Sequence, residues 1–217
     1  PNLVSWKKDL SFSMLASFLE RLEKHWLLVL WGAALGGVLA VAVSFALPRQ
    51  YSSTMRVLVV QANVAGLDPY TALKSTEQIG GNIRELVYTS LVANRVLAET
   101  NGFDAAYFPE DEYQRRKAWQ KAVDVSVAPG TGIMTVTAYH PDRAQAKLLV
   151  EAVAKQIMEQ APNFGYNAQA RVIDTPLPSR WIARPNLPLN AAYGAMLGLI
   201  LAIFWLALET DDRRRSA

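Results

Sequence analysis

The stretch WLLVLWGAALGGVLAVAVSFAL, residues 26–47, decides the fold, because its 22 residues carry no charged side chain. An α-helix rises about 1.5 Å per residue, so this stretch is long enough to cross a hydrocarbon core of about 30 Å. A second uncharged stretch of 22 residues, LPLNAAYGAMLGLILAIFWLAL, occupies positions 187–208. The pair predicts two transmembrane helices. The alternatives are two buried core helices of a soluble protein, or a cleaved signal peptide for the first stretch, and the uncharged length disfavours both.

Basic residues flank the two stretches on the side of the chain termini, at Lys7, Lys8, Arg21, Lys24, Arg213, Arg214 and Arg215. Short basic flanks favour the cytoplasm, and a long loop is translocated largely regardless of its charge. We therefore expect both termini in the cytoplasm and the central segment outside it. Apolar residues at helical spacing between Leu15 and Trp26 predict either a short interfacial helix or an extension of the first span.

The chain is thus expected to have five parts. They are a cytoplasmic N-terminal segment with a juxtamembrane helix at 1–25, transmembrane helix 1 at 26–47, an extracytoplasmic domain at 48–186, transmembrane helix 2 at 187–208, and a cytoplasmic tail at 209–217.

Composition excludes several classes of function. The central segment, 48–186, has 15 Lys or Arg and 13 Asp or Glu, so its charge is balanced and no nucleic-acid surface is expected. The chain has no cysteine and only two histidines, His25 and His140, which disfavours a metal site. Neither a phosphate-binding loop nor a G-x-S-x-G motif occurs. We expect no catalytic residue, no metal and no cofactor, and hence no enzyme.

The central segment alternates between strand and helix patterns. The pattern predicts a strand at 51–61 and then helical residues from 69 to 100 that bend or break at Gly80–Gly81. A solvated charged helix is expected at 109–122, followed by a hairpin of 123–128 and 133–139 with a four-residue connection, 129–132. A helix capped by Asp142 and a short strand at 171–174 complete the segment. This order predicts an α+β domain, a small mixed sheet with packed helices, between the two transmembrane helices. The first and last strands are expected to be neighbours.

The approach to the second span is rich in proline, and the spans themselves carry glycine. The residues are Pro176, Pro178, Pro185 and Pro188, then Gly194 and Gly198, with Gly32 and Gly36 in the first span. Prolines stiffen the backbone and can set the angle at which a helix begins. Pairs of small residues four positions apart permit close helix contact in lipid, although glycine is also common in transmembrane helices without such a role.

Several stretches carry a resemblance to a known family. These are LERLEKHW at 19–26, YSSTMRVLVV at 51–60, TSLVANRVL at 89–97, the stretch 133–157, and the proline and glycine pattern above. The chain resembles the polysaccharide co-polymerase (chain-length determinant, Wzz-type) family, in a short form without a fused tyrosine-kinase domain. It departs from the family pattern at Arg184, Asn186 and Ala202, where the family has Ser, Lys and Gly.

The resemblance implies a non-catalytic scaffold of the bacterial cytoplasmic (inner) membrane. Such a protein would form a homo-oligomer, contact a polysaccharide polymerase or exporter and its lipid-linked glycan, and regulate the chain length or export of an O-antigen, capsule or exopolysaccharide. One alternative is an adaptor that activates a separate cytoplasmic tyrosine kinase of the same pathway. Another is a two-span sensor with an extracytoplasmic ligand domain.

Overall fold

The computed structural model describes residues 23–61, 68–164 and 168–215. The chain divides into two compact units. One comprises residues 1–48 and 185–217 and is called the helical hairpin; the other, Arg49–Arg184, is called the sheet domain. Most of the predicted N-terminal segment, with its juxtamembrane helix, lies outside the described residues.

The helical hairpin consists of α2 (Trp26–Phe45) and α7 (Leu187–Arg215), which pack against each other. Trp26–Phe45 has a mean hydropathy of 2.2 and Leu187–Leu208 of 2.1, and only a small share of either is buried within the protein. Both helices are therefore long and apolar enough to cross a membrane. The helix that begins at Leu187 continues beyond the apolar stretch to Arg215.

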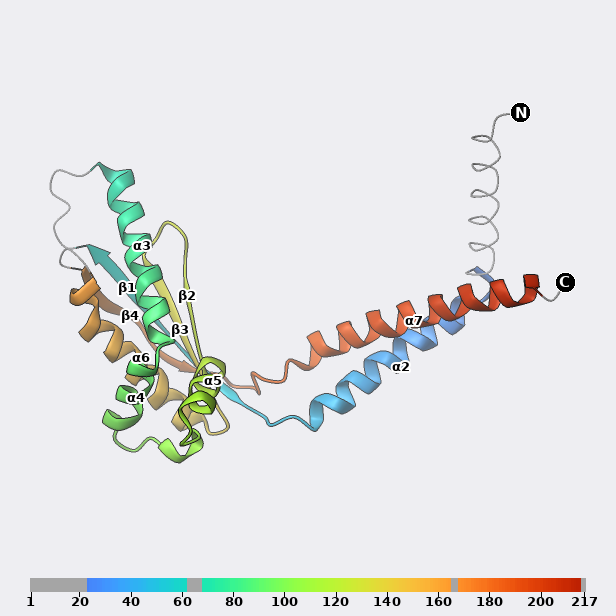
Figure 1. The fold of residues 1–217 in the computed structure, drawn as a ribbon, viewed down its shortest axis with the longest axis horizontal. Helices are drawn as coiled ribbons and strands as arrows, with labels where there is room; N and C mark the ends of the chain where they lie inside the picture. The colour runs from blue at the N-terminus through green and yellow to red at the C-terminus, as the bar shows by residue number, and fades with distance from the viewer. Residues whose placement is uncertain (1–22, 62–67, 165–167, 216–217) are drawn as a thin grey trace. The chain divides into compact units, whose positions relative to one another are not determined.

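The sheet domain is built on four strands in the order β2-β3-β1-β4 (Figure 1). The strands are β1 (Tyr51–Gln61), β2 (Val123–Val127), β3 (Ile133–His140) and β4 (Ala168–Pro178). Every neighbouring pair is antiparallel. The α+β class and the neighbouring first and last strands are confirmed, but the prediction of a mixed sheet was wrong. Because α6 returns the chain along the sheet, β4 enters beside the end of β1, with Ala168 opposite Gln61.

Two further expectations about strands were wrong in extent. The last strand is not limited to 171–174 but runs from Ala168 to Pro178, because ladder hydrogen bonds to β1 continue past the apolar RVI segment despite register shifts near Arg56. The hairpin connection is 128–132 rather than four residues long. Edge position explains how β4 tolerates Pro176 and Pro178, since an edge strand has one side without ladder hydrogen bonds.

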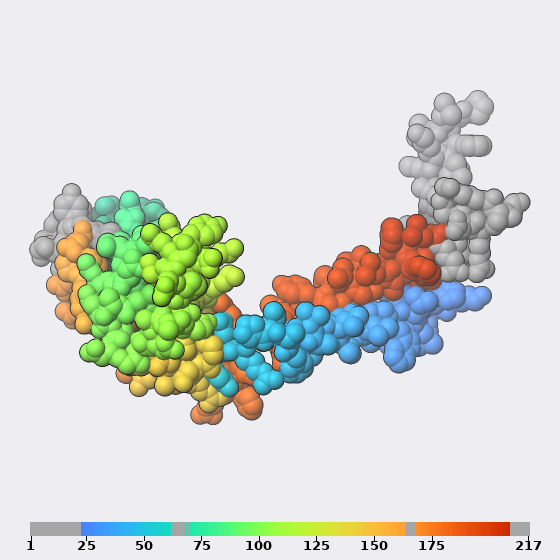
Figure 2. All heavy atoms as spheres, turned by 60° about the horizontal axis from the view of Figure 1, so that its bottom comes forward, coloured from blue at the N-terminus to red at the C-terminus, as the bar shows by residue number. Residues whose placement is uncertain are grey.

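Helices cover one face of the sheet. They are α3 (Pro69–Val87), α4 (Ser90–Glu99), α5 (Glu112–Ala122) and α6 (Arg143–Gln160), with the short 3-10 helices η1 (Ala105–Tyr107) and η2 (Ala161–Phe164). Figure 1 shows α3 and α6 running along the strands, and Figure 2 shows α3, α4 and α5, in teal to light green, gathered on one side of the domain. Buried residues alternate along β1 and β3, so only this face of the sheet is buried.

The core lies between that face and the helices. Its strand residues include Val57, Val59, Met134 and Val136, and its α6 residues include Leu149, Val150, Val153 and Ile157. Asp142 caps α6 as predicted, because its carboxylate accepts hydrogen bonds from the backbone N–H groups of Ala144 and Gln145. The α3 and α5 N-termini are capped in the same way by Asp68 and Asp111.

The expectation of a bend or break at Gly80–Gly81 was wrong. α3 continues through both glycines, and the helix ends only at Val87, before Thr89 begins α4. A Cβ atom added at Gly80 would lie 3.2 Å from Cγ1 of Val127. Gly80 therefore lets α3 approach β2 closely, and this packing offsets the cost of glycine within a helix, about 1 kcal/mol.

The turn between β2 and β3 leads to a matched pair of predictions. Gly130 and Gly132 have φ of 69° and 67°, a region that side chains rarely adopt. A Cβ at Gly132 would fall against the backbone oxygen of Val59 and 2.7 Å from Cγ2 of Thr76, whereas nothing lies within 4 Å of one at Gly130. Gly130→Ala should therefore cost about 1–2 kcal/mol, the left-handed backbone cost alone. Gly132→Ala should cost clearly more.

Urea denaturation followed by circular dichroism would measure both variants of this turn. Equal midpoints for Gly130→Ala and Gly132→Ala would contradict the close approach of the turn to β1.

Candidate functional site

The small residues of the two apolar helices face one another within the helical hairpin. A Cβ added at Gly32 would lie 2.7 Å from Cβ of Ala202 and 3.0 Å from the carbonyl oxygen of Gly198. At Gly36 it would meet the carbonyl oxygen of Gly194 and lie 3.0 Å from Cα of Gly198. Any side chain at these positions would therefore force the backbones of α2 and α7 apart. We call Gly32, Gly36, Gly194, Gly198 and Ala202 the glycine seam.

Close backbone approach has a specific value in lipid. Since lipid tails are as apolar as leucine, helices in a membrane associate through van der Waals packing and short polar contacts rather than through exclusion of water. Glycine backbones in contact also place Cα–H groups near carbonyl oxygens, a weak but recurrent attraction at helix interfaces. The seam thus joins α2 to α7 within one chain.

A polar contact holds the same two helices near the end of α2. The Asn190 amide donates a hydrogen bond of 2.8 Å to the Ser44 hydroxyl, which itself donates to the Ala40 carbonyl at 2.8 Å. Ser44 is buried, with 2% of its surface exposed. Sequence reasoning missed this pair. The available signal was one serine in an otherwise apolar span, with one asparagine near the start of the other.

The prolines of the sequence pattern are divided between the two units. Pro176 and Pro178 lie in the edge strand β4, whereas Pro185 lies just before α7 and Pro188 in its first turn. Proline suits the first turn because the N–H it lacks has no partner there. Asn186 completes this helix start by accepting a hydrogen bond from the Leu189 N–H through its side chain, at 3.2 Å.

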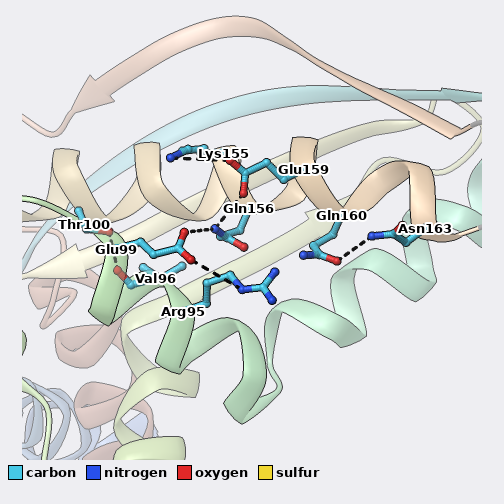
Figure 3. Close-up of polar contacts among 9 residues, drawn as sticks. All are labelled: Arg95, Val96, Glu99, Thr100, Lys155, Gln156, Glu159, Gln160 and Asn163. Atoms are coloured by element: carbon cyan, nitrogen blue, oxygen red, sulfur yellow. Dashed lines mark hydrogen bonds and ion pairs between the residues drawn. The ribbon is translucent and has the colours of Figure 1, made fainter.

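The sheet domain holds a polar cluster between α4 and α6 (Figure 3). The Gln156 amide nitrogen donates to Glu99 at 3.1 Å and to Glu159 at 3.2 Å. Each carboxylate also has a cation, Arg95 at 3.9 Å from Glu99 and Lys155 at 3.7 Å from Glu159. Because each carboxylate already has a cationic partner, we interpret the cluster as a connection between two helices rather than as a binding site.

His140 is the buried histidine of the sheet domain, with 5% of its surface exposed. Its Nδ1 accepts the backbone N–H of Asp142 at 3.0 Å, so the proton of the neutral ring is assigned to Nε2. The ring packs edge-on against Tyr107 and Phe103, at centroid distances of 4.4 and 5.9 Å. Burial lowers the pKa of His140, and the nearby carboxylates of Asp142 and Asp104 oppose this only in part.

The lowered pKa of His140 gives the domain an acid-sensitive element. The unfolded chain binds a proton at His140 near pH 6.5, whereas the folded domain binds it only at lower pH. Its contribution to the free energy of unfolding is therefore complete above pH 6.5, and it decreases as the pH falls toward the folded pKa. We expect the wild type to lose more stability than His140→Gln between about pH 7 and about pH 5. Urea denaturation at each pH would measure this, and parallel curves would contradict it.

Among the described residues, no group of three or more His, Cys, Asp or Glu side chains could hold a metal ion. The described groove between α4 and α6 is small, about 210 Å³. The main structural feature among the described residues is therefore the glycine seam, which joins α2 to α7. The sheet domain forms the other unit of the chain.

Comparison with known proteins bears on the region that contains α2, β1, α3 and α4. Residues 14–100 match the family model described as chain length determinant protein, Wzz. No curated protein matches the chain. The match includes three of the stretches that carried the resemblance, at 19–26, 51–60 and 89–97. Over residues 14–100 the chain is therefore similar to the Wzz chain length determinant family.

Proposed function

We propose that this chain is a non-catalytic, two-span membrane scaffold that determines the chain length of a bacterial surface polysaccharide. The family match carries the proposal, because it assigns residues 14–100 to a chain length determinant. Two apolar helices of membrane-spanning length support the membrane setting. In this proposal both termini lie in the cytoplasm, and 48–186 forms an extracytoplasmic domain.

The proposed mechanism is geometric. Copies of the chain would assemble around or beside a polysaccharide polymerase or exporter and hold it near its lipid-linked glycan. The glycine seam supports this role, because it holds the two spans together as one unit. The helix-free face of the sheet and the edge strand β4, where Ile173 and Leu177 are exposed, offer surface to a second copy.

Gel separation of surface polysaccharide from cells with and without the gene would test the proposal. Deletion should change the distribution of glycan lengths, and expression of the wild-type chain should restore it. An unchanged distribution would overturn the proposed function. The mass of the purified chain in detergent tests self-assembly separately, since a stable monomer would contradict the multi-copy scaffold.

A further inference from the structure

The end of the sheet domain that leads to the membrane is closed by backbone pairing. Gln50 donates to the Arg184 carbonyl at 2.9 Å, and its own carbonyl accepts from Ala183 at 2.8 Å. Only four residues lie between Phe45, the last residue of α2, and Gln50, and only two lie between Arg184 and Leu187, the first residue of α7. This pairing therefore lies where the chain enters and leaves the sheet domain.

Two arginines at this end are held in fixed positions by aromatic rings. The guanidinium carbon of Arg143 lies 4.3 Å from the centre of the Tyr51 ring, and that of Arg184 lies 3.5 Å from the centre of the Tyr139 ring. Each guanidinium donates one further hydrogen bond of 2.7 Å, Arg143 to the Arg180 carbonyl and Arg184 to the Lys121 carbonyl. A guanidinium has five N–H donors, so each retains donors for a ligand.

These cations are not neutralised by carboxylates of the described chain. Its four salt bridges involve Lys74, Arg95, Lys147 and Lys155, and none includes Arg143, Arg180 or Arg184. The carboxylate nearest in sequence, that of Asp142, accepts hydrogen bonds at the start of α6. Positive charge at this end of the domain is therefore available to an external anion.

Apolar residues lie beside the cations. Trp181 is 83% exposed and Ile182 is 38% exposed, directly after Arg180 and before Arg184. A tryptophan this exposed is costly in water, but tryptophan is enriched at the headgroup level of membranes, where an apolar ring and an N–H are both accommodated. We call Arg143, Arg180, Trp181, Ile182 and Arg184 the basal surface.

We propose that the basal surface binds the headgroups of anionic phospholipids, with Trp181 and Ile182 entering the interface. Guanidinium groups bind phosphate oxygens in a planar, two-pronged arrangement, and the aromatic rings under Arg143 and Arg184 orient them for it. Such an anchor would hold the sheet domain against the bilayer surface. The proposal rests on the two-span membrane setting and requires no polysaccharide.

The test uses the full chain in nanodiscs and exploits its lack of cysteine. Spin labels at Ile182→Cys and at Thr131→Cys, in the β2–β3 turn, would be compared for collision with oxygen, which enters lipid, and with a water-soluble nickel chelate. In nanodiscs containing phosphatidylglycerol, the label at 182 should have an oxygen-to-nickel ratio several-fold above that at 131. Arg143→Gln with Arg184→Gln should lower the ratio at 182 toward that at 131.

Each other outcome overturns the proposal. Equal ratios at 182 and 131 would show no contact with lipid. The same high ratio in purely phosphatidylcholine nanodiscs would show an apolar contact without headgroup charge. Protection from nickel without a gain in oxygen collisions would indicate a protein contact instead. A label at Trp31→Cys reports whether the first span is inserted in the bilayer. If this label is not in lipid, the two-span membrane setting fails, and this proposal fails with it. If it is in lipid and the label at 182 is not, only the proposal for the basal surface fails.

Discussion

Replacing Gly36 by leucine is expected to separate α2 from α7 and to abolish normal control of glycan length. The new side chain would meet the carbonyl oxygen of Gly194 and the Cα of Gly198, and neither backbone atom can move without moving α7. Overpacking costs about 1–3 kcal/mol, so the closed hairpin should be weakened about 5- to 150-fold. Cross-linking of Ser44→Cys to Asn190→Cys in membranes, with a reagent of short span, would measure the separation of the helices. These two side chains are in contact in the wild type.

The neighbouring glycine provides the control. A Cβ at Gly37 would lie 3.4 Å from the Ala191 carbonyl oxygen and 3.6 Å from Cβ of Ala195, which is ordinary or nearly ordinary contact. Gly37→Ala should therefore retain cross-linking and the wild-type glycan distribution. If Gly36→Leu cross-links as fast as Gly37→Ala, the glycine seam does not hold the spans together.

Replacing Trp119 by alanine is expected to be among the most destabilising single changes in the sheet domain. The Trp119 side chain is fully buried, its ring packs 5.9 Å from Phe108, and its indole N–H donates to the Val87 carbonyl at 2.8 Å. The carbonyl of Val87 stands where α3 ends, so the indole satisfies an acceptor that the helix leaves unpaired. Trp119→Ala should lower the free energy of unfolding by about 3–5 kcal/mol.

Two further variants test which property of Trp119, its buried ring or its indole hydrogen bond, accounts for the loss of stability. Trp119→Phe keeps most of the ring but leaves the buried Val87 carbonyl without its donor, which should cost about 1–3 kcal/mol. Trp181→Ala removes an exposed tryptophan and should change stability by no more than about 0.5 kcal/mol. Urea denaturation of the full chain in detergent, followed by circular dichroism, gives all three values. Equal losses at positions 119 and 181 would contradict the buried role of Trp119.

Trp119 also shows where sequence reasoning lost detail. The segment 109–122 is dominated by charged residues, a pattern that predicts a solvated helix. Its charged side chains are exposed except Arg115, which is half-buried, but α5 begins only at Glu112 and buries Trp119 and Ala122. The signal was an apolar pair three positions apart in a charged helix. The residue that Trp119 contacts, Val87 at the end of α3, is distant in sequence, so the contact could not be predicted without the fold.

The extent of strand β4 could not be predicted from the sequence, for a different reason. A strand is recognised from its own side chains when one face is buried, as in β1 and β3. β4 is largely exposed, contains two prolines and follows an irregular register with β1. Its extent is set by hydrogen bonds to its neighbour, and side-chain pattern carries little information about such bonds.

The sequence by itself determined the two apolar helices, the span of β1, the capping of α6 by Asp142 and the family resemblance, because each depends on local composition or on a contiguous motif. Only the tertiary structure decided that the sheet is antiparallel throughout, that Gly80 serves packing rather than a bend, and that Gly32 and Gly36 meet Gly194, Gly198 and Ala202 within one chain. The physical reason is distance along the chain. A run without charged residues indicates a membrane environment through its own composition. The close approach of α2 to α7, in contrast, depends on two backbone segments more than 150 residues apart in the sequence.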